Sequence, residues 1–197
     1  MRRRGYSTKW YDSKLGCDGD LALSCNIPGI MRMCRESRVA AVMLAPPCTT
    51  FPMARDRTEQ IRSHKYPNGV PWWLNDKGRL DLNSANEFMS GVYRLITTFM
   101  SHSVPFIVEN PLSSRLWKLP FFAKLCESDR VHLRHCDQCQ YGTQWRKATT
   151  FLCGNIDQED SMQLQKRCHG KTCSSSQLKH IQLDGRTLTR KAQFFYQ

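Results

Sequence analysis

The feature that most constrains the fold is an apolar run that ends abruptly at two prolines. Residues 39–45 read Val-Ala-Ala-Val-Met-Leu-Ala and are followed by Pro46, Pro47 and Cys48. Such a run is typical of a buried strand, and the prolines end it because proline has no N–H to donate to a neighbouring strand. The sequence therefore predicts a strand with a thiol just beyond its carboxyl end, where open α/β sheets bind ligands.

A helix and a second strand are predicted further along the chain. Residues 80–101 carry apolar side chains at three- and four-residue spacing, which indicates an amphipathic helix with Asp81 or Asn83 as its cap. Residues 104–108 read Val-Pro-Phe-Ile-Val, which is typical of a strand. Because a strand, a helix and a strand form a right-handed crossover, the two strands are expected to run parallel and side by side, about 4.8 Å apart.

This topology would bring two reactive groups to one edge of the sheet. Cys48 follows the first strand, and Glu109 follows the second. Arg55 and Arg57, downstream of the cysteine, could favour its thiolate. Taken singly, each group also has a plain structural interpretation: a buried cysteine after a strand, and a carboxylate paired with Arg115 or Lys118.

Composition favours a polyanionic partner. The chain has 197 residues, a formal net charge of +12 and a pI near 9.4, which favours nucleic acid first and an anionic membrane surface second. The alternative to a polyanionic partner is that the basic residues simply form a solvated surface. The sequence has neither the roughly 20 consecutive apolar residues of a membrane span nor the apolar block of a secretory signal. An intracellular protein, in nucleus or cytoplasm, with reduced cysteines is therefore expected.

Two parts of the chain differ in character. Residues 1–130 predict an α/β core, with further elements at 6–12 (a strand) and 31–37 (a helix). Residues 131–197 alternate short β-like pieces with cysteine, glycine and histidine, and predict strands with a Cys/His-rich segment. Between the expected first strand and the helix, residues 52–79 are rich in proline, glycine and charge, which is typical of a lid or binding loop, with a disordered segment as the alternative.

Three segments carry a resemblance to a known family. Residues 45–51 (Ala-Pro-Pro-Cys-Thr-Thr-Phe) and 108–111 (Val-Glu-Asn-Pro) resemble the two central motifs of the cytosine-C5 DNA methyltransferases. Residues 144–146 (Gln-Trp-Arg) resemble the family's Gln-x-Arg-x-Arg motif, and the string 139–151 looks closest to compact phage and mobile-element forms. The resemblance spans about residues 6–195. It implies a Rossmann-like S-adenosylmethionine-dependent methyltransferase sheet with a small Cys-rich C-terminal elaboration.

The resemblance also implies roles for these residues. Cys48 would add to C6 of a flipped-out cytosine, Glu109 would act as the acid at N3, and Arg146 would contact the base. The ring would then take a methyl group at C5 from S-adenosylmethionine, with DNA as the partner. Flipping the base costs a few kcal/mol of stacking energy.

The cofactor half of the resemblance is incomplete. Asp12 resembles the acidic position that binds ribose hydroxyls, Asp20 resembles the aspartate that meets adenine, and Pro46 is a further candidate cofactor contact. The family's opening Phe-x-Gly-x-Gly turn is absent upstream of Tyr6. A sheet truncated at its N-terminus is therefore expected, and it would fit a fragment, an inaccurate gene start or a degenerate copy without cofactor binding. A separate N-terminal segment or a larger polyprotein is a candidate source of the missing part. The alternative is an inactive, DNA-binding relic.

Nucleic-acid contacts are expected from the loop and the third motif. The cationic and polar candidates are Arg55, Arg57, Arg62, Lys65 and Gln144. Trp72 or Trp73 could stack on a base, although ordinary packing is the other interpretation.

A zinc site is a further expectation. Cys136 and Cys139 form a Cys-x-x-Cys pair, and Cys168, Cys173 and His180 follow at spacings that a tetrahedral ion can use. His135 and His169 are alternative ligands, and unlinked reduced thiols are the alternative to a metal. In the third interpretation of the whole chain, Cys48 is structural and the protein is a zinc-stabilised nucleic-acid-binding module.

Overall fold

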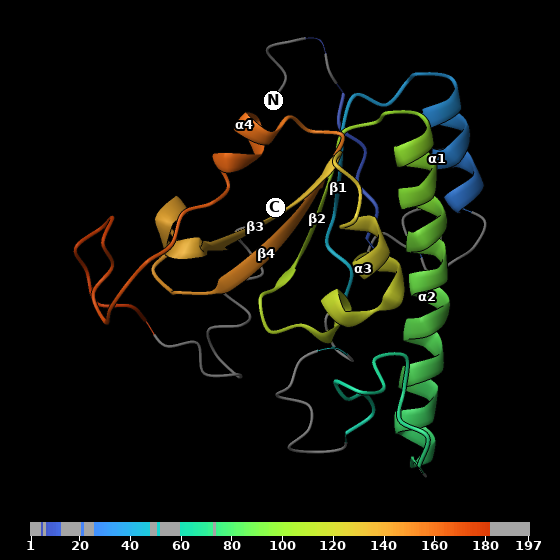
Figure 1. Cartoon of the computed structure of the whole chain (residues 1–197), viewed down its shortest axis with the longest axis horizontal. Helices are drawn as coiled ribbons and strands as arrows, with labels where there is room; N and C mark the ends of the chain where they lie inside the picture. Colours follow the sequence, from blue (N-terminus) through green and yellow to red (C-terminus); the bar gives the residue numbers. More distant parts are fainter. Residues whose placement is uncertain are drawn as a thin grey trace.

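The computed structural model describes residues 5, 7–12, 21, 26–47, 51, 60–72 and 74–181. In chain order the elements are α1 (Asn26–Arg35), β1 (Val42–Leu44), α2 (Asp76–Ser101), β2 (Phe106–Pro111), the 3-10 turn η4 (Arg115–Lys118), α3 (Pro120–Leu125), β3 (Val131–Asp137), the 3-10 turn η5 (Gln138–Tyr141), β4 (Ala148–Gly154) and α4 (Gln158–Met162) (Figure 1). The chain is thus a mixed α/β protein, as the sequence predicts.

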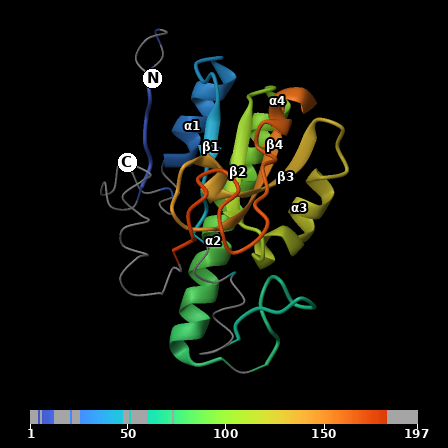
Figure 2. The ribbon, with the colours of Figure 1, turned by 90° about the vertical axis from the view of Figure 1, so that its left-hand side faces the viewer.

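Within the described residues the sheet has four strands, in the order β1-β2-β4-β3 (Figure 2). β1 and β2 are parallel neighbours joined through α2, with Leu44 opposite Val108, which confirms the expected strand–helix–strand unit. β4 is antiparallel to both β2 and β3. Three of the four strands therefore point the same way, and β4 runs against them between β2 and β3.

The main core lies between α2 and the sheet. The buried side chains of α2 recur at the spacing the sequence predicts and include Leu95, Ile96 and Phe99. The Phe99 ring lies 5.7 Å from that of Phe106 in β2. α1 packs along α2, where Gly91 leaves room for Ile27. This packing fixes β1 and β2, and therefore the two strand ends, against a rigid helix.

Several expected boundaries differ from the structure. The cap of α2 is Asn75, whose side chain accepts a hydrogen bond from the Gly78 N–H at 2.8 Å, so the expected caps Asp81 and Asn83 are wrong. The spacing of apolar residues does not reveal where the helix begins, because the first turn of the helix is polar. β1 is shorter than expected, α1 begins and ends earlier than residues 31–37, and β2 extends through Glu109. Residues 7–12, the described part of an expected strand, are irregular.

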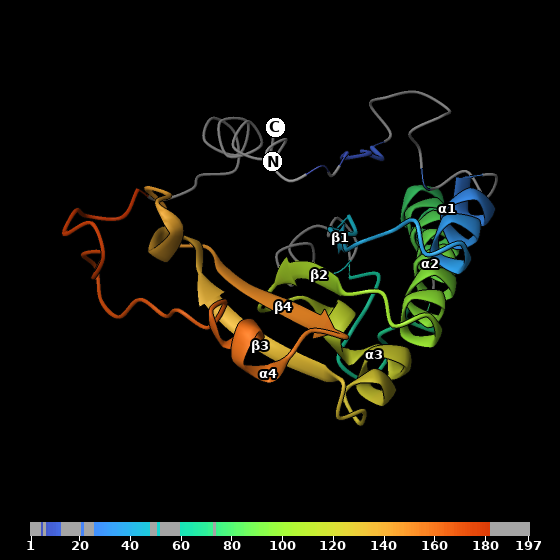
Figure 3. The ribbon, with the colours of Figure 1, turned by 90° about the horizontal axis from the view of Figure 1, so that it is seen from above.

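The C-terminal part contains the expected strands β3 and β4 and a Cys-rich segment. Residues 163–181 lie beyond the end of the sheet that is farther from α1 and α2 (Figure 3). No helix in the described ranges is both long and apolar enough to cross a bilayer.

Candidate functional site

A buried hydrogen bond joins the segments at the carboxyl ends of β1 and β2. Asn110, which is 1% exposed, donates its Nδ2 proton to the carbonyl oxygen of Pro46 at 3.0 Å. The parallel register places Leu44 opposite Val108 and so brings the residues just beyond them together. The two motif segments are therefore neighbours in space. Cys48 itself lies outside the described residues, as do Asp20, Arg55, Arg57 and Trp73.

Replacing Asn110 with alanine tests this bond. The change leaves the buried Pro46 carbonyl without its donor, so we expect the free energy of unfolding to fall by about 1–2 kcal/mol. Urea unfolding at neutral pH measures the effect. Asn83→Ala, at an exposed position in α2, is the control and should change stability by less than about 0.5 kcal/mol. An equally small change for Asn110→Ala would contradict the role of the bond.

Glu109 lies inside β2 and is 8% exposed. Its Oε1 atom accepts from the Lys147 ammonium at 3.2 Å, so its partner is Lys147 in place of the expected Arg115 or Lys118. Lys147 immediately precedes β4, whose antiparallel pairing with β2 brings it to Glu109. In the sequence, Lys147 stands out only because it follows the third motif. Its contact with Glu109 becomes evident only from the pairing of the strands.

Arg146 is held by a buried carboxylate that sequence reasoning missed. Asp137, at the end of β3, is fully buried, and its Oδ1 atom accepts from Arg146 Nε at 3.2 Å. Its Oδ2 atom accepts from Arg167 Nε at 3.0 Å and from the Cys168 N–H at 2.8 Å. Burial raises the pKa of the Asp137 carboxyl, but the Cys168 N–H and the two guanidinium groups outweigh it and hold that pKa below its ordinary value.

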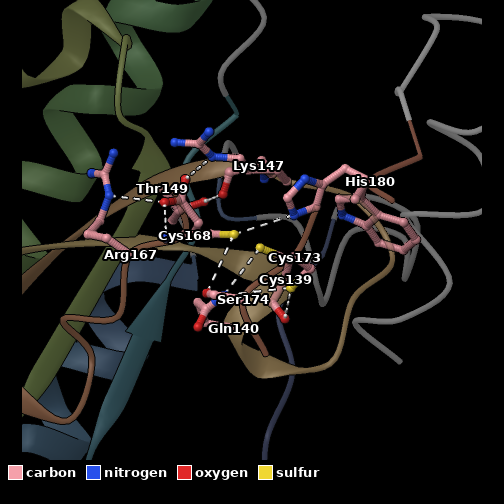
Figure 4. A network of polar contacts seen from close by, with 12 residues as sticks. Cys139, Gln140, Lys147, Thr149, Arg167, Cys168, Cys173, Ser174 and His180 are labelled. Atoms are coloured by element: carbon pink, nitrogen blue, oxygen red, sulfur yellow. Dashed lines mark hydrogen bonds and ion pairs between the residues drawn. The ribbon is translucent and has the colours of Figure 1, made fainter. Parts of the chain in front are cut away.

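A second cluster joins three cysteines and a histidine (Figure 4). The ligand atoms of Cys139, Cys168, Cys173 and His180 all lie within 4.8 Å of one another, which is a distance at which they could hold a metal ion. Cys136 is not a member of this group, so its expected role as a ligand is wrong. It lies in β3 near Glu109, and burial, with smaller contributions from Asp137 and Glu109, raises the pKa of its thiol to about 11.

The alternative histidine ligands also lie outside the group. His135 Nδ1 shares a hydrogen bond with the Thr150 hydroxyl at 3.0 Å, and His169 is exposed.

Arg62 is not placed to contact a phosphate. Its side chain is fully buried, lies 4.2 Å from the centre of the Phe51 ring, and donates to the Pro67 carbonyl and to Asn86 Oδ1. Burial lowers the pKa of the guanidinium to about 10. The expected phosphate contact of Arg62 is therefore wrong for this structure, and its role is to fasten the 60–72 segment to α2.

The other expected contact residues are more exposed. Lys65 and Gln144 lie at the surface, and Trp72 is half-exposed, with its ring nearly perpendicular to that of Tyr66. Asp12 is exposed in the irregular segment 7–12, so it does not sit at a strand end as the resemblance implies.

A hollow of about 350 Å³ opens beside the carboxyl end of β2. The cationic or titratable side chains that line it are His64, Arg115, Lys118 and His135. Thr150, which also lines it, lies opposite Asn110 in the β2–β4 pairing. A hollow of this charge at a strand end is suited to an anionic ligand.

Comparison with known proteins gives no relative. Neither the protein-family models, nor the curated proteins, nor the solved structures contain a match to this chain.

Proposed function

We propose that this chain is the catalytic core of an S-adenosylmethionine-dependent enzyme that methylates C5 of cytosine in DNA. The observation that carries the proposal is the hydrogen bond from Asn110 to the Pro46 carbonyl, because it joins the Pro-Pro-Cys segment to the Glu-Asn-Pro segment. The parallel pair β1–β2 supports a Rossmann-like sheet, in which ligands bind at the carboxyl ends of strands.

The chemistry assigns one role to each strand end. Cys48 Sγ would add to C6 of a flipped-out cytosine, forming the S–C6 bond while the C5–C6 double bond becomes nucleophilic at C5. Glu109 would deliver a proton to N3 and take it back when the sulfur leaves, while the Lys147 ammonium, 3.2 Å away, lies beside that carboxyl group. After C5 has taken the methyl group, loss of the C5 proton to a water molecule, return of the N3 proton to Glu109 and departure of the sulfur as thiolate would restore the aromatic ring.

S-adenosylmethionine would supply the methyl group. The described residues do not complete a site for it, since Asp12 is exposed outside any strand and Asp20 lies beyond the described ranges. Of the two expected cofactor positions that the structure describes, Asp12 and Pro46, only the buried Pro46 lies beside the strand ends. The proposal thus depends mainly on the base-binding half of the site.

DNA is the proposed partner on grounds of charge. The chain carries a net charge of +12, and Arg115 and Lys118 line the hollow beside the strand ends. Lys65 remains a candidate phosphate contact, as do Arg55 and Arg57 outside the described ranges. Arg146, 38% exposed at its side chain, is proposed as the base contact.

A second candidate function is a nucleic-acid-binding module that a metal stabilises. The cysteine–histidine group favours it, because such a group can stabilise a fold without catalysis. An inactive methyltransferase relic belongs to the same class of outcome: it would bind DNA and form no adduct.

The test is incubation with duplex DNA that carries 5-fluorocytosine, with and without S-adenosylmethionine. Fluorine cannot leave C5 as the proton does, so an active enzyme stalls as a covalent complex that survives denaturing electrophoresis. We expect this complex only when the cofactor is present. DNA binding by fluorescence anisotropy without any adduct would reject the enzyme in favour of the binding module.

A further inference from the structure

The cysteine–histidine group has the geometry of a closed metal site. A tetrahedral zinc ion about 2.3 Å from each sulfur and about 2.0 Å from nitrogen sets its ligand atoms roughly 3.5–3.8 Å apart. In the structure Cys168 Sγ lies 3.5 Å from His180 Nε2, and Cys139 and Cys173 complete a set within 4.8 Å. Four protein ligands fill the tetrahedron, which is the arrangement of structural rather than catalytic zinc.

The histidine presents the correct nitrogen. The Nδ1 atom of His180 lies 3.1 Å from the Lys171 carbonyl oxygen. Because a carbonyl only accepts, Nδ1 carries the proton in this contact, and Nε2 keeps its lone pair on the side of the sulfurs. Metal-binding histidines typically have their second ring nitrogen fixed in this way.

The sulfurs are surrounded by hydrogen-bond donors. Gln140 Nε2 donates to Cys139 Sγ at 3.8 Å and to Cys173 Sγ at 3.7 Å. The Ser174 hydroxyl donates to Cys168 Sγ at 3.7 Å. Such donors stabilise the negative charge of thiolates that bind a cation (Figure 4).

The surrounding segment has no hydrocarbon core of its own. Within residues 166–181, all of which are described, only Cys168 and Cys173 are buried, and with Cys139 they form a separate buried cluster. Apart from the single bridge between Thr172 and Lys179, this segment has no regular secondary structure. Three small thiols bury too little apolar surface to offset the entropy of ordering such a segment, so a further stabilising group is needed.

The group is also connected to the proposed base-contact arginine. The Cys168 N–H donates to Asp137 Oδ2, and Asp137 Oδ1 accepts from Arg146. The Asp137 N–H donates in turn to the Lys166 carbonyl at 2.9 Å. The position of Cys168 therefore determines where the carboxylate lies, and the carboxylate determines where Arg146 lies.

We infer that Cys139, Cys168, Cys173 and His180 bind one structural zinc ion, and that the ion holds Arg146 in position through Cys168 and Asp137. Three thiolates and one imidazole are a donor set that zinc prefers over magnesium or calcium, which take oxygen ligands. Arg146 is then a residue whose order depends on the metal. The metal site itself does not depend on the methyltransferase proposal, so the two can fail separately.

The first test measures the metal on the full chain. Atomic spectroscopy should find about one zinc ion per chain, and cobalt exchanged into the site should give the visible absorption of tetrahedral cobalt with thiolate ligands. Cys168→Ser should remove most of both signals. Cys126→Ser, which changes an exposed cysteine outside the group, should keep them.

The second test measures the connection to Arg146. Removing the ion with a chelator should increase trypsin cleavage after Arg146 and Arg167 at least about tenfold, because local order limits cleavage. Cleavage after Arg94, on the exposed face of α2, should change little and so reports any global unfolding.

Three outcomes would overturn the inference. Purified chain that neither retains zinc nor takes up cobalt would exclude the site. Metal content that survives Cys168→Ser, or a disulfide between two of the three cysteines in place of a metal, would exclude this ligand set. Unchanged cleavage after Arg146 upon chelation would reject the coupling.

Discussion

Replacing Cys48 with alanine should abolish the covalent complex with 5-fluorocytosine DNA. In the proposed mechanism the Cys48 sulfur is the atom that bonds to C6, so we expect the yield of complex to fall at least about 1,000-fold. DNA binding should stay within about twofold, because the substitution leaves the proposed phosphate contacts Lys65, Arg55 and Arg57 in place. Quantitative denaturing electrophoresis measures the first effect, and fluorescence anisotropy measures the second.

The matched control is Cys126→Ala, which removes an exposed thiol far along the chain. It should form the complex at the wild-type yield. If the Cys48 variant kept its adduct, another residue would be the nucleophile. If both variants and the wild-type chain formed no adduct, the binding module would be the better description.

The strand–helix–strand unit could be predicted because its signals are local. Two prolines end β1 whatever surrounds them, and the apolar period of residues 80–101 shows which face of α2 is buried. The crossover rule then places β2 beside β1. The proximity of Pro46 and Asn110 follows from these three steps without any information on the rest of the chain.

Other contacts could not be predicted because they depend on strand pairing between distant segments. Lys147 meets Glu109 only because β4 inserts between β2 and β3, an order that no local pattern specifies. Arg62 looked like a surface cation in a polar loop. Its burial depends on the ring of Phe51 and on Asn86, which is in α2.

The members of the cysteine–histidine group could also be predicted only in part from the sequence. The Cys-x-x-Cys spacing pointed to Cys139, which belongs to the group, and also to Cys136, which lies in β3 before the chain turns into η5. Because Cys136 is a strand residue paired opposite Thr149, its thiol is buried beside the sheet and away from the other sulfurs. Spacing alone leaves both cysteines as candidate ligands, and the end of the strand separates the one that belongs to the group from the one that does not.

Replacing Asp137 with asparagine should cause the largest loss of stability among these variants. The carboxylate is fully buried and accepts hydrogen bonds from Arg146, Arg167 and the Cys168 N–H. An amide of the same shape loses the negative charge and turns an N–H toward a donor. We expect the free energy of unfolding to fall by about 2–4 kcal/mol. The loss is smaller than for an ion pair with both partners buried, because the two guanidinium groups are about one-third exposed.

Urea unfolding at neutral pH measures this loss, with Asp129→Asn, at an exposed carboxylate, as the control that should change stability by less than about 0.5 kcal/mol. Trypsin cleavage after Arg146 in the folded Asp137 variant should also rise, since its guanidinium loses the acceptor that orients it. An Asp137 variant as stable as the control would mean that the buried charge contributes nothing net. The linkage from Cys168 to Arg146 would then have no energetic basis, because Asp137 is the residue through which both are joined.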